Sequence, residues 1–225
     1  MNKKIFIYIS IFLISYINSY INGITVSHLQ EDIDWNLVKN NNISFAILRI
    51  GWMIGEQGVI DPYFEINYNK AKAIGIQVGA YIESESFSVG ESEIEAYRVL
   101  KELEGKKFEW PIFFDVHPGI ENWGDSKKRF NTFMNILKQN NYYCGIRSTA
   151  KVLSEKFKDN NNEYAYWVAE YNKEFWDDDI SLFDDWGIWQ YSSNGSVDGI
   201  NGDVDMNYAR IDYPDIIISK GFNGY

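Results

Sequence analysis

Two side chains capable of acid–base chemistry end one apolar run of the sequence, Phe113-Phe114-Asp115-Val116-His117. Residues at positions i and i+2 of a strand point to the same side, so Asp115 and His117 are expected to share a face. A carboxylate buried beside an imidazole favours the imidazolium form, which can donate a proton. The pair is therefore a candidate for general acid–base catalysis.

Further polar residues stand where other apolar runs end. In barrels of alternating strands and helices, the chemistry takes place at the carboxyl ends of the strands. Carboxylates and aromatic rings gathered on that rim are typical of a carbohydrate site, because acids cleave glycosidic bonds and rings pack against sugar faces. The polar residues at these predicted ends are Ser27, His28, Arg49, Glu83, Glu85, Asp115, His117, Arg147, Ser148, Glu170, Tyr171, Gln190, Tyr191 and Asp205.

The elements that must position these side chains alternate along the chain. Alternation of strands and helices favours a parallel sheet. Seven or eight strands in about 200 residues favour one compact α/β barrel domain, and the later connections leave little room for helices. The predicted helices are Tyr63–Ile74, Val89–Leu103 and Ser126–Gln139. The predicted strands are Ile24–Ser27, Phe45–Gly51, Gln77–Glu83, Pro111–His117, Tyr143–Ser148, Ala165–Tyr171, Gly187–Ser192 and Val204–Asn207.

The composition is that of a globular protein with an acidic surface. The 225 residues are 45% hydrophobic and 17% aromatic, enough for a core without disulfides or metals. A net charge of −11 argues against binding to nucleic acid or to anionic membranes, because both attract basic patches. The single cysteine, Cys144, is expected to be a small buried hydrophobe.

The amino terminus has the pattern of a secretory signal peptide. Lys3 and Lys4 precede an apolar run from Ile5 to Ile14, which is too short to span a membrane, and a more polar stretch follows. We therefore expect residues 1–21 to be removed and residues 22–225 to form the mature domain. Its 19 basic and 32 acidic residues leave a charge of −13. The expected location is outside the cell or in the lumen of a secretory or digestive vacuole.

Several motifs together make the chain similar to glycoside hydrolase family 25, the Chalaropsis-type lysozymes (N-acetylmuramidases). The similarity runs from Gly23 to about Tyr208. It is carried by Gly23-Ile24-Thr25-Val26-Ser27-His28-Leu29-Gln30, Ile33-Asp34-Trp35, Ile47-Leu48-Arg49-Ile50-Gly51, Asp61, Phe64, Asn67, Ala71, Gly75, Gly79-Ala80-Tyr81, Pro111, Asp115-Val116-His117, Trp167-Val168-Ala169-Glu170-Tyr171, Ile188-Trp189-Gln190-Tyr191-Ser192 and Gly199-Ile200-Asn201-Gly202-Asp203-Val204-Asp205-Met206-Asn207.

The resemblance implies an irregular TIM-like β/α barrel that acts on the glycan strand of bacterial peptidoglycan. The expected reaction is cleavage of the linkage between N-acetylmuramic acid and N-acetylglucosamine. Family members carry acids at four points of the site, which match Thr25, Asp115, His117 and Asp205 here. Two of the four acids are therefore replaced, and His117 stands at the position of the general acid.

These replacements leave the proton donor open. Asp115 and Asp205 can still supply negative charge near the developing oxocarbenium ion. His117 can donate a proton as imidazolium, and Glu83 can do so if Tyr81 faces the barrel interior, since the two residues share strand parity. Glu170 is a third candidate. With no donor at all, the protein would be a glycan-binding pseudoenzyme.

The family resemblance and the aromatic residues at the strand ends also indicate which residues contact the sugar. The predicted substrate-binding residues are Thr25, Tyr81, Tyr171, Trp189 and Tyr191, with at least one of the last three lining the cleft. His117, Asp115 and Asp205 could together hold a divalent ion, but no ligand-spacing motif such as His-Glu-x-x-His supports it. We therefore expect no metal, no cofactor and no nucleic acid, and a monomer that binds the peptidoglycan glycan strand.

Overall fold

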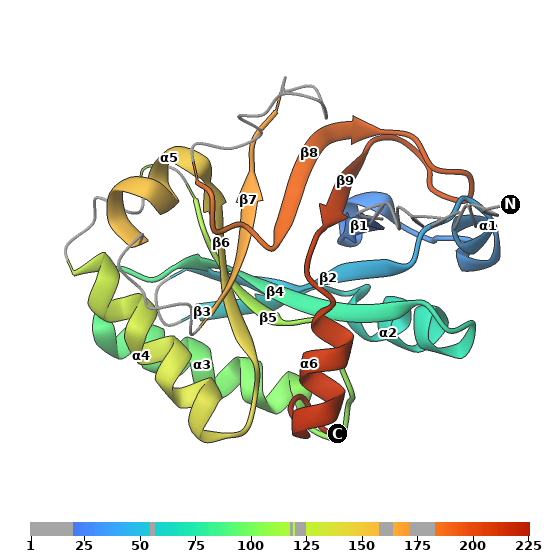
Figure 1. Ribbon diagram of the computed structural model, residues 1–225. Coiled ribbons are helices and arrows are strands. Elements are labelled where there is room, and N and C mark those ends of the chain that lie inside the picture. Colours follow the sequence, from blue (N-terminus) through green and yellow to red (C-terminus); the bar gives the residue numbers. More distant parts are fainter. Residues whose placement is uncertain (1–19, 55–56, 118, 120–124, 158–163, 172–182) are drawn as a thin grey trace, which may run out of the picture.

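The computed structural model describes residues 20–54, 57–117, 119, 125–157, 164–171 and 183–225. Its strands form one sheet in the order β1-β9-β8-β7-β6-β5-β4-β2-β3. Because β1 also pairs with β2, the sheet closes into a barrel, and β3 extends β2 as a hairpin (Figure 1). The strands are β1 Ile21–Val26, β2 Phe45–Ile54, β3 Gln57–Ile60, β4 Gln77–Glu85, β5 Ile112–Val116, β6 Cys144–Thr149, β7 Ala165–Ala169, β8 Ile188–Gly195 and β9 Val204–Ala209.

The predicted single-domain α/β barrel is confirmed, with one difference in strand direction. From β1 through β2, β4, β5, β6 and β7 to β8, neighbouring barrel strands are parallel. Strand β9 is antiparallel to both β8 and β1, so the sheet is not wholly parallel. Residues 196–203 join β8 to β9, and so short a connection permits an antiparallel return but no helical crossover.

The helices cover the outside of the barrel and one of its ends. The three predicted helices are confirmed, and α1 and α6 are additional. Helix α3 begins with a capping box in which the Ser88 hydroxyl accepts from the Glu91 N–H at 3.2 Å. The helical segments are η1 His28–Gln30, α1 Trp35–Asn40, α2 Phe64–Ala73, α3 Val89–Leu103, α4 Ser126–Gln139, α5 Ala150–Val152, the π-helical turn η3 Leu153–Phe157 and α6 Tyr213–Lys220.

Large aromatic side chains fill the barrel interior below the site. Phe45 stacks on Trp110 with ring centroids 3.8 Å apart, and Trp110 meets Tyr213 of α6 edge-on at 5.8 Å. Trp110 lies two residues before the start of β5, so its contact with Tyr213 places α6 at the amino-terminal end of the barrel. Gly145 leaves room for these aromatic rings, because an added Cβ there would lie 2.4 Å from the Phe113 ring. The described interior of the barrel is therefore a packed core below the carboxyl ends of its strands.

A second apolar layer lies between the strands and the surrounding helices, and it contains Cys144, which is 1% exposed as expected.

The first strand begins at Ile21, which pairs with Ala209 of β9 and lies one residue before the expected start of the mature domain. The predicted signal segment lies almost wholly outside the described residues. Within the described part of the chain, no helix has the length and apolar character to cross a bilayer.

Candidate active site

Strand register sets the polar side chains of four neighbouring strands side by side. Glu83 of β4 is the register partner of Asp115 on β5, Asp115 is that of Arg147 on β6, and Arg147 is that of Trp167 on β7. Across the closing strands, Thr25 of β1 is the partner of Asp205 on β9. Residues in register share a face of the sheet, so these side chains converge at the carboxyl-terminal rim.

Two adjoining cavities occupy this rim. The inner cavity, about 230 Å³, is lined by Thr25, Tyr81, Glu83, Asp115, His117, Arg147, Trp167, Tyr171, Gln190 and Asp205. The outer cavity, about 350 Å³, is lined by Thr25, Val26, Ser27, Leu29, Gln30, Arg49, Tyr81, Glu83, Ser193, Asn201, Gly202, Asp203 and Asp205. The inner cavity thus brings together all four predicted catalytic residues and three of the five predicted sugar contacts.

An arginine of the neighbouring strand holds Asp115. Nη1 of Arg147 lies 3.0 and 2.9 Å from the two carboxylate oxygens, and its Nη2 donates to Oε1 of Gln190 at 2.8 Å. Asp115 is 1% exposed, so the guanidinium balances a carboxylate that water hardly reaches. Asp115 and His117 lie close together as strand parity predicts, but Asp115 forms its ion pair with Arg147, a permanent cation from the neighbouring strand.

Glu83 has its own arginine, supplied by β2. Nη1 of Arg49 lies 3.2 Å from Oε1 of Glu83, while Nε donates to Oδ2 of Asp61 at 2.9 Å. Asp61 also accepts from the backbone N–H of His28 at 2.9 Å. The His28 ring contacts Arg49 and so packs against this group. A shift of register between Arg49 and Gly51 marks a bulge next to the site.

Asp205 lies in a different electrostatic environment. Burial raises the pKa of Asp205 to about 6; Arg147 opposes this rise, and the charges of Asp115 and Glu83 add to it. Within the described part of the chain, Asp205 makes no ion pair with a lysine or an arginine. A carboxyl of this kind keeps its proton in mildly acidic solution, which is what a general acid requires.

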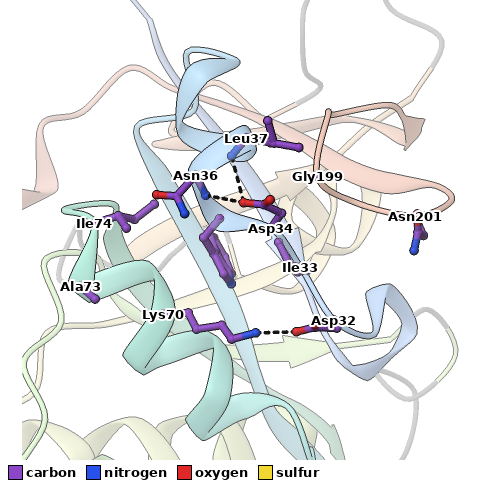
Figure 2. A pocket seen from close by; sticks show the side chains of 11 residues that line it. Asp32, Ile33, Asp34, Asn36, Leu37, Lys70, Ala73, Ile74, Gly199 and Asn201 are labelled. Carbon is purple, nitrogen blue, oxygen red and sulfur yellow. Dashed lines mark hydrogen bonds and ion pairs between the residues drawn. The ribbon is translucent and has the colours of Figure 1, made fainter.

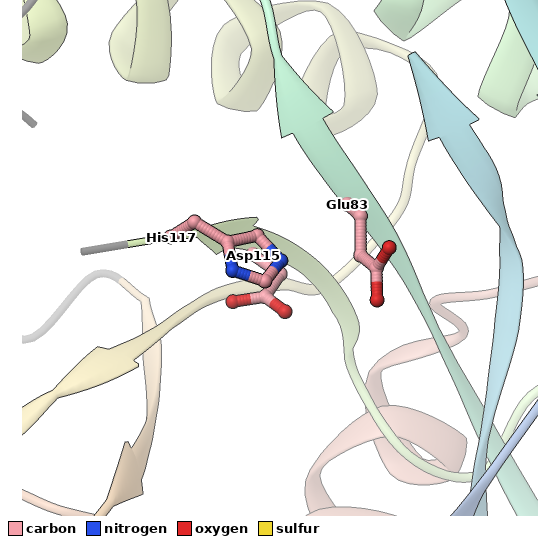
Figure 3. A group of neighbouring side chains, drawn as sticks. All are labelled: Glu83, Asp115 and His117. Carbon is pink, nitrogen blue, oxygen red and sulfur yellow. The ribbon is translucent and has the colours of Figure 1, made fainter. Parts of the chain in front are cut away.

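Figure 3 shows the His117 ring beside Asp115, with the Glu83 carboxylate directed toward the same space from β4. One ligand atom of each residue lies within 4.8 Å of the others. This cluster differs from the set considered for a metal, in which Asp205 took the place of Glu83. Arg147 and Arg49 already supply positive charge to its two carboxylates, which disfavours a cation there. We interpret it as a proton-transfer group.

The hydroxyl of Thr25 is engaged, although the resemblance expects an acid there. Its Oγ1 accepts from Nδ2 of Asn207 at 3.0 Å, and Oδ1 of Asn207 accepts from Nε1 of Trp167 at 2.9 Å. Thr25 is 4% exposed. The position is thus part of a satisfied buried network, which fixes the Trp167 ring in the floor of the inner cavity.

Two predicted sugar contacts lie elsewhere. Trp189 is 1% exposed and donates from Nε1 to the backbone oxygen of Glu170 at 2.8 Å, and Tyr191 stacks on Tyr208 with centroids 4.3 Å apart. Neither residue lines the two cavities, and neither does Glu170. The reason is strand parity: Gln190 faces the interior, so its neighbours face outward. Tyr171, which is 40% exposed, lines the inner cavity as predicted.

Three functional residues were not among the predicted site residues. Arg147, Gln190 and Trp167 line the inner cavity together with the acids. Arg147 and Gln190 do end predicted strands, so their positions were visible in the sequence. What was missing was the register that places Arg147 beside Asp115. The Arg147 guanidinium also lies 5.5 Å from the centre of the Trp167 ring, a cation–π distance.

A further cavity, about 780 Å³, lies outside the barrel between α1 and α2 (Figure 2). The charged side chains Asp34 and Lys70 in its lining are already used locally. Asp34 accepts from the N–H groups of Asn36 and Leu37 at 3.0 and 3.3 Å, and Lys70 pairs with Asp32 at 2.5 Å. We therefore assign the functional site to the strand ends.

Comparison with known proteins agrees with this architecture. The family model described as glycosyl hydrolases family 25 matches residues 24–200. The uncharacterized protein YegX of Escherichia coli K12 is 33% identical over 196 residues, covering 83% of this chain and 68% of its own length. Lysozyme M1 of Streptomyces globisporus is 27% identical over 202 residues, covering 84% of this chain and 67% of its own.

The fold has counterparts among solved structures. The catalytic domain of endolysin ply40 from Listeria monocytogenes bacteriophage P40 superimposes with a TM-score of 0.74 at 19% identity. The matched region covers 88% of this chain and 97% of that domain. This chain therefore belongs to glycosyl hydrolase family 25. The family and its lysozyme members support the peptidoglycan-directed glycosidase function that the sequence resemblance implies.

Proposed function

We propose that this family 25 protein is a secreted lysozyme-type glycosidase that hydrolyses the N-acetylmuramic acid to N-acetylglucosamine linkage of peptidoglycan. The observation that carries the proposal is the convergence of Asp115, Asp205, Glu83 and His117 in one cavity at the strand ends. Negative charge and a proton donor within one sugar-sized hollow are what glycoside cleavage needs. The cationic partners Arg147 and Arg49 hold two of these carboxylates in place.

Glycan contact fits the remaining lining of the cavities. Tyr81 and Trp167 meet edge-on at 5.7 Å, and Tyr171 reaches solvent at the mouth. Aromatic surface and amide or hydroxyl groups at one rim suit an N-acetylated sugar, which has apolar faces and polar edges. The outer cavity extends this surface past Ser27, Gln30 and Asn201 and gives a longer glycan room to continue.

The test is clearance of purified peptidoglycan, followed as turbidity from pH 4 to pH 8. We expect clearance by the wild type and its loss in Asp115→Asn, which keeps the shape of the side chain but removes the charge opposite Arg147. Asp198→Asn, an exposed residue of the β8–β9 connection, is the matched control and should clear at the wild-type rate.

A second candidate function is glycan binding without turnover. It is favoured by Thr25, because the residue at one acid position of the family is buried and fully engaged by Asn207. Pull-down of the protein with insoluble peptidoglycan, without release of soluble fragments at any pH, would establish this alternative. Release of reducing ends that depends on Asp115 would establish the enzyme.

Secretion is part of the proposal. The amino-terminal pattern of Lys3 and Lys4 followed by an apolar run supports export and removal of the first 21 residues or so. Sequencing the amino terminus of the exported protein tests this. Since β1 begins at Ile21, we expect the cut just before it or at its first residues, where the sheet loses least pairing.

A further inference from the structure

The three carboxylates that line the inner cavity fall into two electrostatic kinds. Asp115 and Glu83 each have an arginine within 3.2 Å, from the neighbouring strand β6 and from β2 respectively. Asp205 is partly buried on β9, and no such partner is found for it among the described residues. A carboxylate paired with a guanidinium is stabilised as the anion, whereas burial without a counter-ion favours the protonated acid. Environments that separate carboxyl groups in this way define acid and base roles.

The positions of the carboxylates in the two cavities support the same division of roles. The inner and outer cavities share four residues: Thr25, Tyr81, Glu83 and Asp205. A glycan that occupied both cavities would pass from one to the other at these residues, which would bring the bond between two adjacent sugars to Glu83 and Asp205. Asp115 and His117 line the inner cavity alone. The donor must reach the oxygen between two sugars, and Asp205 stands at that junction.

We propose that Asp205, rather than His117, is the general acid of this protein, and that Glu83, whose charge is balanced by Arg49, accepts a proton from the attacking water. The inference rests on the proposed glycosidase function. Asp205 gives its proton to the glycosidic oxygen as the bond from that oxygen to C1 breaks. The oxygen of a water molecule then bonds to C1, and the proton that this water loses passes to Glu83. Exchange with solvent returns a proton to Asp205 and removes one from Glu83.

The direction of the pH dependence follows from this assignment. The groups that share the two cavities with Asp205 include Thr25 from β1 and Gln190 from β8. The charged or titratable ones are Arg49, Arg147, Asp115, Glu83, His117, Tyr81, Tyr171 and Asp203. With its pKa raised to about 6, Asp205 is protonated below that pH. Activity should therefore fall as pH rises through about 6. If Asp205 served as the base, activity would rise over the same interval.

The experiment measures kcat and KM on solubilised peptidoglycan glycan strands from pH 4 to pH 8. We expect Asp205→Asn to lower kcat by about 10² to 10⁴-fold with a small change in KM, the usual contribution of a general acid. The residual rate should no longer fall through pH 6. Asp205→Glu should restore part of kcat, and Asp198→Asn should behave as the wild type. Thermal unfolding checks that each variant folds.

Carbon-13 NMR measures the protonation of the Asp205 carboxyl directly. Its signal is assigned by comparison with Asp205→Asn and followed as a function of pH. The proposal is supported if Asp205 titrates near pH 6 and if the fall in activity above that pH disappears in Asp205→Asn. Titration at the ordinary value of an aspartate overturns it, as does a fall that persists in Asp205→Asn but disappears in His117→Gln. A wild type that hydrolyses nothing at any pH would instead refute the glycosidase function itself, and with it any proton donor.

Discussion

Nη1 of Arg147 lies 2.9 Å from Oδ2 of Asp115, at the end of the neighbouring strand and in direct register with it. The arginine is a permanent cation, and it also donates to Gln190 of β8. It thereby connects three strands of the rim and sets the charge of the inner cavity. Much of the chemistry expected of Asp115 and Asp205 therefore depends on Arg147.

Replacing Arg147 with methionine should weaken both folding and activity. The change leaves Asp115 buried without its counter-ion, and breaking a buried pair in this way costs about 3–5 kcal/mol of unfolding free energy. Arg147 lowers the pKa of Asp205, so its removal should raise that pKa and move the alkaline fall in activity to higher pH. Urea unfolding and the pH–rate profile measure the two effects.

Arg210→Met is the matched control for this variant. Arg210 is exposed and lies 4.4 Å from the centre of the Trp186 ring, outside both cavities. Its loss should cost less than about 1 kcal/mol and leave the pH profile in place. An unchanged profile in Arg147→Met would contradict the electrostatic role.

Glu95 on α3 should make stability depend on pH. It is fully buried, Oγ of Ser84 donates to its Oε2 at 2.9 Å, and burial raises its pKa to about 8. A raised pKa means that the folded protein binds this proton more tightly than the unfolded chain does. The resulting stability is complete below about pH 4.5 and is lost as pH rises through 8.

Glu95→Gln should remove this pH-dependent loss of unfolding free energy, which amounts to at most about 5 kcal/mol between pH 4.5 and pH 8. Urea unfolding at pH 5 and pH 9 measures it. Glu93→Gln, on the exposed face of the same helix, should keep the wild-type dependence. Parallel stability curves for Glu95→Gln and the wild type would show that Glu95 is ionised in the fold.

Gly145→Ala should destabilise the barrel. The added Cβ would lie 2.4 Å from the Phe113 ring and 2.6 Å from the backbone oxygen of Ala165, so neighbouring strands must shift. Overpacking of this kind costs about 1–3 kcal/mol. Gly90→Ala in the first turn of α3 meets no atom within 4 Å and should be neutral or stabilising by up to about 1 kcal/mol. Thermal unfolding compares the two, and equal effects would contradict the packing argument.

Restoring the family acids should increase activity. Thr25→Asp with His117→Glu places carboxyl groups at both substituted positions of the site, where they can supply charge and a second proton donor. We expect clearance at least about tenfold faster than that of the wild type, because a positioned acid contributes about 10² or more. Turbidity measures it. Without any gain, the cleft itself must differ from that of active relatives.

Association with bacterial walls should respond to salt. The full chain carries a net charge of −11, and bacterial walls are also anionic, so long-range repulsion slows their encounter at low salt. Binding to insoluble peptidoglycan, measured by sedimentation, should improve with moderate salt and with lower pH. A decline on adding salt would mean that attraction between opposite charges dominates.

Part of the site was predictable because short-range patterns decide it. Strand parity predicted that Asp115 shares a face with His117 and that Glu83 shares one with Tyr81, and the family resemblance placed Asp205 in the same site; all five line the inner cavity. The helices 89–103 and 126–139 were also predicted to the residue, since their apolar faces repeat at helical spacing. Each of these features depends on residues a few positions apart.

The amino-acid sequence by itself determined the alternation of strands and helices, the single domain, and which acids reach the rim. Only the tertiary structure decided that Arg147 neutralises Asp115, that Asp205 makes no ion pair with a described lysine or arginine, and that Trp189 faces away from the cleft. The physical reason is barrel closure. Parity assigns a side chain to one of two faces, but the register between strands far apart in sequence decides which charges lie within 3 or 4 Å of one another.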